Sequence, residues 1–316
     1  MKYEEISNLI QFKENFESNL FMPNEIFEDL KANIKNTPHI AFAYSYIYLC
    51  TFNYRYAKHF SKGEIIDNAK AKELLGYDPK NRTLNYLIKK GGLLDEMEYL
   101  ESTRDYPVSW EYSKMNAEDI QFTLSSEFGD IKGYLPEIPK RFFLKYPVKG
   151  FTRILEEDGE EFETIGTFYE VDNTHNIPFE VFLYCMSNED IGCTGFYLYA
   201  YLKHKNDLFE GGFDVSLQNL SSDTGISETG IDRYLGALKG YKLVDFIHNQ
   251  EFFAIGMRKE DRKANTYITN KHCMFNDIHI PFNKIEIMKK KEYFEMLKSQ
   301  REPVNRADFD VNELPF

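Results

Sequence analysis

The stretch from Ser216 to Val244 constrains the fold of this chain most, because its apolar residues have the spacing of two helices joined by a tight turn. A first predicted helix carries Leu217 and Leu220 on one face. A second predicted helix has a stripe at steps of three, one and three residues, formed by Ile231, Tyr234, Leu235 and Leu238. The pattern predicts two short helices that each bury one face.

Three residues between these helices suit a tight turn. Gly225 can adopt the positive φ that the turn needs, and Ile226 is an apolar residue that can fill the wedge between the helices. Ser227 is a good N-cap, because its hydroxyl accepts a hydrogen bond from a free backbone N–H of the next helix. We therefore predict a helix-turn-helix whose second helix leaves its polar side exposed.

Strand-like runs follow at Leu243–Ile247, Phe252–Met257 and Thr266–Thr269, and a predicted helix, Thr194–Lys203, precedes the motif. The basic segment Arg258–Lys263 lies between the second and third runs, as the tip of a predicted hairpin. This order resembles the winged-helix domains of replication proteins and regulators of bacterial plasmids and phages, in which the exposed helix enters the major groove of DNA. The alternative is a helical hairpin of the core with a chance Gly-Ile-Ser turn.

A similar order of elements occurs earlier in the chain. His39–Tyr56 is a predicted aromatic helix, a short helix ends at Leu75, and Pro79 suits the first turn of a new helix. The inward stripe of that exposed helix consists of Leu84, Leu87 and Ile88, and Gly91-Gly92 ends it. Leu93–Leu100 and Val108–Tyr112 are expected to pair as a second candidate wing. The repeat is one of architecture, not of sequence.

The middle of the chain is rich in β-forming residues at Arg141–Arg153 and Phe162–Val171. Asp158-Gly159 between them predicts a hairpin turn. The acidic run Glu156–Glu161 around this turn is interpreted as a solvated loop. A metal site is the alternative, although the run lacks the spacing of a calcium loop.

Together these patterns predict an α+β protein with two winged helix-turn-helix domains joined by a β-rich connector. The expected boundaries are winged-helix domain 1 at 20–114, an acidic β-rich connector at 115–175, winged-helix domain 2 at 176–270, a C-terminal helix at 271–300 and a flexible, disordered acidic tail at 301–316. A chain of 316 residues with 42% hydrophobic residues is long and apolar enough for two cores.

Composition also bears on location. No apolar run reaches the length of about 18 residues that a membrane span needs, and the start of the chain lacks the pattern of a signal peptide. The four cysteines share no CxxC spacing, which is typical of free thiols in a reducing compartment. We therefore expect a cytoplasmic protein.

The charge is unevenly distributed. The net charge is −13, and residues 101–175 carry sixteen acids and eight bases, a net of −8. By contrast, the segment Lys80–Lys90 has four bases and no acid. An acidic body with local basic segments is compatible with specific DNA binding and also with a winged helix that binds protein.

The last residues form a second recognisable pattern. Phe282–Gln300 is a predicted helix with the basic run Lys289–Lys291, and the chain then ends in DFDVNELPF. This ending resembles the C-terminal tip of bacterial single-stranded-DNA-binding proteins through Asp308, Asp310, Glu313, Leu314, Pro315 and Phe316. The resemblance implies docking on replication or repair proteins. The alternative is a chance acidic tail.

Motifs of common enzymes are missing from the sequence. It has no phosphate-binding P-loop, no HExxH, no paired CxxC, no GxSxG and no His-apolar-His pair. We therefore expect no catalysis, no cofactor and no metal.

The resulting hypothesis is a sequence-specific double-stranded DNA-binding protein that serves plasmid or phage replication. Alternatives are a transcriptional regulator of a mobile element and a winged-helix module that binds protein without contacting DNA; a homodimer stays open. Arginine and lysine suit phosphates or guanine, and asparagine suits adenine. The predicted DNA contacts are Lys80, Asn81, Arg82, Asn85 and Lys89 in the first unit, Ser227, Glu228, Thr229, Asp232 and Arg233 on the second exposed helix, and Arg258, Lys259, Arg262 and Lys263 in the wing.

Overall fold

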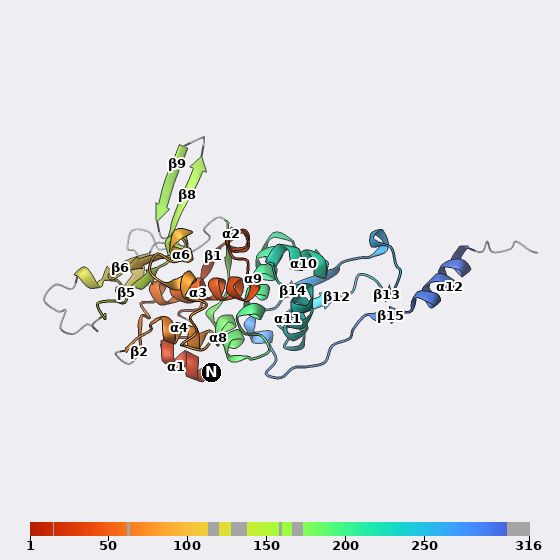
Figure 1. Cartoon of the computed structure of the whole chain (residues 1–316), viewed down its shortest axis with the longest axis horizontal. Coiled ribbons are helices and arrows are strands. Elements are labelled where there is room, and N and C mark those ends of the chain that lie inside the picture. The colour runs from red at the N-terminus through yellow and green to blue at the C-terminus, as the bar shows by residue number, and fades with distance from the viewer. Residues whose placement is uncertain are drawn as a thin grey trace, which may run out of the picture.

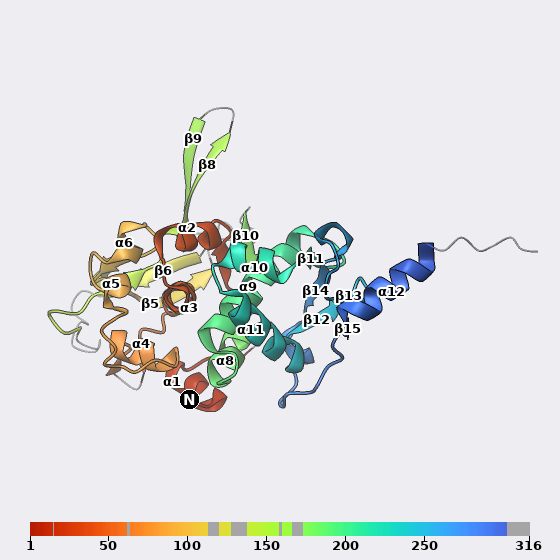
Figure 2. The ribbon, with the colours of Figure 1, turned by 45° about the vertical axis from the view of Figure 1, so that its right-hand side comes forward.

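Two long aromatic helices, α3 (Thr37–Arg55) and α9 (Gly192–Leu208), pack against each other at the centre of the molecule (Figures 1 and 2). The structure is a computed structural model and describes residues 1–14, 16–61, 64–112, 120–127, 138–157, 160–165 and 173–301. Every residue of α3 from Ile40 to Arg55 is buried. A helix that is apolar all round must be covered on all sides, so the rest of the fold is arranged around this pair.

The first half of the chain covers α3. Its helices are α1 (Tyr3–Ile10), α2 (Ile26–Asn33), α4 (Asn68–Leu74), α5 (Asn85–Ile88) and α6 (Leu93–Glu96). Its strands form antiparallel pairs: β2 (Phe60–Ser61) with β3 (Glu64–Ile65), β4 (Glu101–Thr103) with β7 (Leu144–Tyr146), and β5 (Pro107–Tyr112) with β6 (Ile120–Leu124). The fold is therefore α+β, as expected, with several small sheets.

The predicted hairpin between Leu93–Leu100 and Val108–Tyr112 is wrong. Residues Leu93–Glu96 form a single helical turn, α6, in which the backbone N–H of Met97 bonds to the carbonyl of Leu93. Leu94, Tyr99 and Leu100 all reach the core from this compact turn, so their burial does not alternate as in a strand. The predicted exposed helix of this unit is likewise only the one turn of α5.

The second half begins where β10 (Thr174–Asn176) pairs with β1 (Phe21–Pro23), and continues with α8 (Phe179–Ser187) and α9. Then come β11 (Phe213–Val215), α10 (Leu217–Thr224), α11 (Glu228–Gly240), β12 (Val244–Ile247) and β14 (Asn265–Thr269). The three strands form an antiparallel sheet in the order β11-β14-β12. The helix-turn-helix predicted from Ser216 to Val244 is confirmed as α10 and α11.

The predicted pairing of Phe252–Met257 with Thr266–Thr269 is wrong. β14 pairs instead with β12, with Val244 opposite Thr269, and β13 (Phe252–Ala254) leaves this sheet to pair in parallel with β15 (Glu286–Met288). Arg258–Lys263 is consequently not the tip of a two-stranded hairpin. It contains the short 3₁₀ helix Lys259–Asp261 within a long excursion between β12 and β14.

The predicted central hairpin is confirmed as β8 (Thr152–Glu157) and β9 (Glu160–Ile165), with Glu157 opposite Glu160. Its turn residues Asp158 and Gly159 lie outside the described residues. The hairpin extends away from the body of the molecule (Figure 1). Part of the run Arg141–Arg153 is helical, because Val148–Phe151 forms α7 between β7 and β8.

The predicted C-terminal helix begins later than expected, because residues Glu286–Met288 form β15 before α12 (Lys290–Arg301) starts. α12 packs on β13 and β15 in a separate cluster around Ala254, Met257 and Tyr293. Residues 302–316, with the predicted tail and tip, lie outside the described residues. No helix within the described ranges is long and apolar enough to cross a bilayer.

One continuous core of buried side chains extends from Ile6 to Tyr267 and includes residues of both predicted winged-helix units. We therefore expect both halves to unfold together. The single tryptophan, Trp110, packs on Tyr56 in the first half of the chain. Its fluorescence and the far-UV circular dichroism of the whole chain should therefore give the same unfolding midpoint in urea. Two separated transitions would show independent domains.

His59 makes stability depend on pH. Its imidazole is buried between Tyr54 and Tyr106, and burial lowers its pKa from 6.5 to about 3. The unfolded chain therefore binds the proton more readily, so stability is full above pH 6.5 and falls as the pH drops towards 3. The loss should reach about 2 kcal/mol by pH 5. In urea titrations at pH 7 and pH 5, His59→Gln should lose less stability than the wild type; an equal loss would contradict this origin.

Candidate nucleic-acid interface

The turn between α10 and α11 forms as its residue types predict. Gly225 has a φ of +73° and ends α10, Ile226 is buried, and the Ser227 hydroxyl accepts a hydrogen bond from the backbone N–H of Gly230 at 3.2 Å. The inner face of α11 buries Ile231, Leu235 and Leu238. The opposite face is thereby turned away from the core.

All five residues predicted to face DNA from this helix are exposed: Ser227, Glu228, Thr229, Asp232 and Arg233. The guanidinium of Arg233 lies 5.2 Å from the ring centre of Tyr234. Two carboxylates and one guanidinium leave this set of five with a net negative charge. Any electrostatic attraction to nucleic acid would therefore have to come from neighbouring segments.

Two lysines near the end of α11 are engaged within the protein. The ammonium group of Lys239 lies over the rings of Phe246, Tyr267 and Phe282 at 4.4, 5.2 and 5.4 Å. Burial lowers its pKa to about 8. Lys242 forms an ion pair with Asp245 at 2.5 Å.

Two of the four predicted wing residues, Arg258 and Arg262, are engaged in ion pairs or hydrogen bonds within the protein. Arg258 forms an ion pair with Asp261 at 2.8 Å and with Glu260 at 3.5 Å. Arg262 donates two hydrogen bonds to the carbonyl of Met257 at 3.2 and 2.9 Å. Lys259 and Lys263 are exposed. The cationic character of this segment is thus lower than its composition indicates.

The segment Lys80–Lys90 has exposed cations, as predicted. Lys80, Arg82 and Lys89 are exposed, and none of the three takes part in an ion pair with any described residue. Lys90 is also exposed and lies over the ring of Phe143 at 4.0 Å. This segment is therefore a local positive surface on an acidic molecule.

A buried lysine that the sequence analysis overlooked holds this segment in place. Lys72 is 4% exposed, and its ammonium group donates to the backbone carbonyl of Asn81 at 2.5 Å and to Oδ1 of Asn85 at 2.7 Å. Oδ1 of Asn81 accepts from the N–H and hydroxyl of Thr83. Asn81 and Asn85, the two asparagines predicted to contact DNA, therefore each accept a hydrogen bond within the protein through the side-chain oxygen.

The two predicted surfaces meet at the beginning of α3. The Thr37 hydroxyl donates to the carbonyl of Gly225, in the turn between α10 and α11. Two residues further along α3, Nδ1 of His39 lies 3.0 Å from the hydroxyl of Tyr86, which belongs to α5. The helix-turn-helix and the Lys80–Lys90 segment are consequently held on one helix end. Neither Thr37 nor His39 was predicted to have this role.

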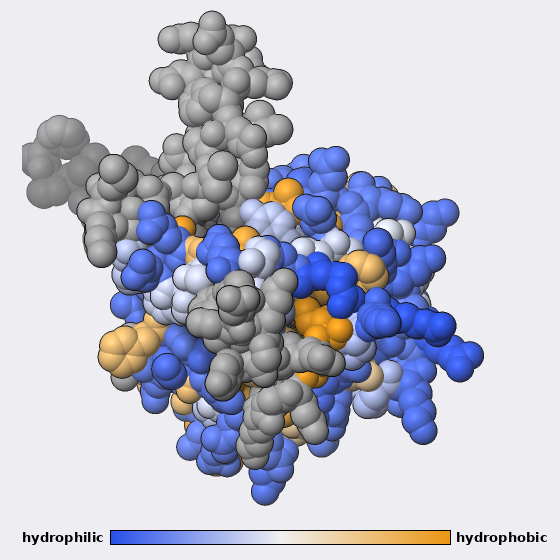
Figure 3. Space-filling view, turned by 90° about the vertical axis from the view of Figure 1, so that its left-hand side faces the viewer, coloured by the Kyte–Doolittle hydropathy of each residue, from blue (hydrophilic) through white to orange (hydrophobic). Residues whose placement is uncertain are grey.

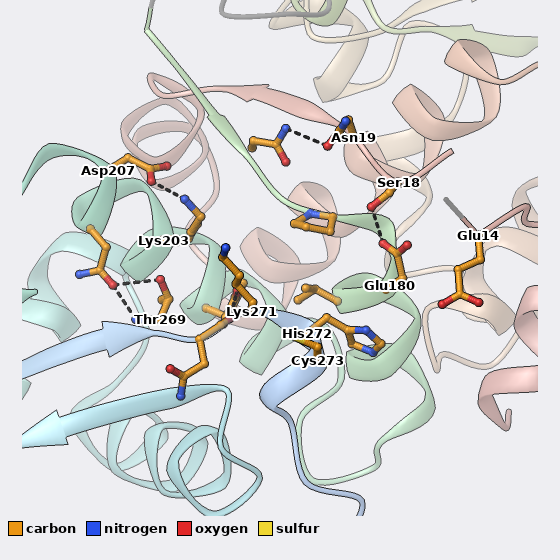
Figure 4. Close-up of a pocket in the computed structure, with 16 residues that line it drawn as sticks. Glu14, Ser18, Asn19, Glu180, Lys203, Asp207, Thr269, Lys271, His272 and Cys273 are labelled. Carbon is orange, nitrogen blue, oxygen red and sulfur yellow. Dashed lines mark hydrogen bonds and ion pairs between the residues drawn. The ribbon is translucent and has the colours of Figure 1, made fainter. Parts of the chain in front are cut away.

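A polar cleft of about 670 Å³ lies between the N-terminal segment, α8, α9 and the residues after β14 (Figure 4). Most of its polar groups already have partners. Ser18 donates to Glu180 at 2.6 Å, Lys203 forms an ion pair with Asp207, and burial lowers the pKa of His272. We assign no ligand to this cleft.

Burial raises the pKa of the thiols of Cys50 and Cys193 to about 12, so these groups are poor nucleophiles. Within the part of the chain that the structure describes, no group of three or more His, Cys, Asp or Glu side chains is arranged to hold a metal ion.

The described surface at the end that carries β5 and β6 is mostly hydrophilic, with a small apolar area (Figure 3).

Comparison of the chain with models of known protein families, with curated proteins and with solved structures finds no significant match.

Lys72→Met should loosen the Lys80–Lys90 segment, because methionine keeps the apolar stem and removes both hydrogen bonds. We expect a loss of about 1–3 kcal/mol in the free energy of unfolding and faster amide hydrogen exchange from Asn81 to Lys89. Lys70→Met is the matched control, since Lys70 pairs with the half-exposed Glu73 and should cost less than about 0.5 kcal/mol. Unchanged exchange in Lys72→Met would remove this role.

Proposed function

We propose that this protein is a winged-helix, sequence-specific double-stranded DNA-binding protein that acts in the replication of a plasmid or phage. The observation that carries the proposal is the order α9, β11, α10, α11, β12, β14, with the sheet order β11-β14-β12 and an exposed α11. DNA-binding helix-turn-helix proteins place the second helix of the motif, which corresponds to α11, in the major groove.

The first half contributes differently from the second. Helices α3, α4 and α5 repeat the order of α9, α10 and α11, but the strands that follow pair as β5-β6 and β4-β7 and do not form a three-stranded sheet. We therefore propose one winged helix, with Lys80, Arg82 and Lys89 as phosphate contacts from the adjoining segment. Their positive charge would compensate for the carboxylates of α11.

The proposal is tested with duplexes selected from random sequence by the full-length protein. Arg82→Ala combined with Arg233→Ala should weaken binding about 30-fold or more and abolish the footprint, because one change removes a phosphate contact and the other a contact from α11. Lys298→Ala, on exposed α12, serves as the control and should leave the footprint unchanged. Full protection by the double variant would contradict the proposal.

A second candidate is a winged helix that binds protein, favoured by Glu228 and Asp232 on α11 and by the paired Arg258. A salt titration separates the two functions. DNA binding through about six phosphates should weaken steeply, with a slope near −5 in log affinity against log salt. Weak affinity with little salt dependence would favour the protein-binding candidate.

Residues 308–316 allow an experiment that separates a replication role from transcriptional regulation. A basic pocket of a replication or repair protein would attract the acidic residues Asp308, Asp310 and Glu313. Leu314, Pro315 and Phe316 would then dock in that pocket. Removing residues 308–316 should then abolish recruitment of that partner while the DNA footprint persists. A regulator would keep its full function after this truncation.

A further inference from the structure

A segment after β14, Asn276–Lys284, crosses the C-terminal end of α11; we name it the strap. The backbone N–H of Asn276 donates to the carbonyl of Tyr241, and that of Ile280 donates to the carbonyl of Gly240, both at 2.9 Å. The hydroxyl of Tyr184 donates to the carbonyl of Asn276 at 2.6 Å. The strap therefore satisfies carbonyls that the end of a helix leaves without partners.

Side-chain contacts also hold the strap against α11 and β12. The ring of His279 lies so close to Gly240 that a Cβ there would come within 2.1 Å of Nε2, and it meets the ring of Tyr241 edge to face at 5.4 Å. Phe282 packs on Phe246 at 5.4 Å between ring centres. These contacts place the strap beside the outward face of the helix.

A groove of about 360 Å³ separates the strap from that face. Arg233 and Gly236 of α11 line one side, and His279 and Lys284 of the strap line the other. Among the described residues that line the groove, Asp190 alone carries a carboxylate, and this group accepts a hydrogen bond from the hydroxyl of Tyr241 at 2.8 Å. The described lining of the groove thus carries two positively charged side chains, Arg233 and Lys284, and one negatively charged side chain, Asp190.

We propose that this groove binds a backbone phosphate of the duplex that α11 contacts; this inference rests on the proposed function. A phosphodiester fits the groove because arginine can bind its two free oxygens together and lysine supplies a compact positive charge. Gly236 has no side chain, and a Cβ at this position would meet no atom within 4 Å. The groove floor therefore leaves room for the sugar-phosphate backbone.

Gly236→Glu and Gly236→Gln provide a matched pair of variants, because both side chains have space and differ by one charge. In the full-length protein, Gly236→Glu should bind the selected duplex about tenfold or more weakly than Gly236→Gln, with equal melting temperatures. Lys284→Gln should reduce the slope of log affinity against log salt by about 0.9, the value for one phosphate. Lys298→Gln should leave the slope unchanged.

The outcomes separate this inference from the proposed function. Wild-type protein that binds no duplex in a salt-dependent manner would overturn both. Wild-type protein that binds DNA while Gly236→Glu matches Gly236→Gln, or while Lys284→Gln keeps the wild-type slope, would overturn the phosphate groove and leave the proposed function in place.

Discussion

The contact between α3 and α9 is the constraint on which the rest of the structure depends. Both helices bury large aromatic side chains, and burying a tyrosine is favourable only when its hydroxyl has a partner. On α3, Tyr44 bonds to Nε2 of His175 and Tyr48 to the carbonyl of Ile177, both at 2.8 Å. α3 thereby holds β10 and the residue that follows it against the helix pair.

The tyrosines of α9 position the candidate interface in the same way. Tyr197 donates to the carbonyl of Thr224 at 3.2 Å, directly before the turn into α11. Tyr199 donates to the carbonyl of Asn270 at 2.9 Å, directly after β14. The exposure of α11 is thus a consequence of core hydroxyl groups that hold the turn on one side and the sheet on the other.

Features that depend on neighbouring residues could be predicted from the sequence, whereas features that depend on distant partners could not. Gly225, Ile226 and Ser227 act through local geometry, so the helix-turn-helix was predictable. The partner of β14 is chosen by packing, so β12 could not be distinguished from Phe252–Met257 by alternation alone. Lys72 illustrates the same limit within the site, because its partners Asn81 and Asn85 are recognised only when the loop folds back on α4.

The distribution of charge explains how an acidic chain can present a DNA-binding face under the proposed function. On α11, Glu228 and Asp232 repel phosphates, but a carboxylate can accept a hydrogen bond from cytosine. Positive charge then lies beside these carboxylates, in Lys80–Lys90, which is held with the turn before α11 on the beginning of α3, and in Arg233 and Lys284 at the middle of α11. Under the proposed function, this arrangement would disfavour non-specific binding and favour a duplex whose bases donate hydrogen bonds to the carboxylates, so it would increase selectivity more than affinity.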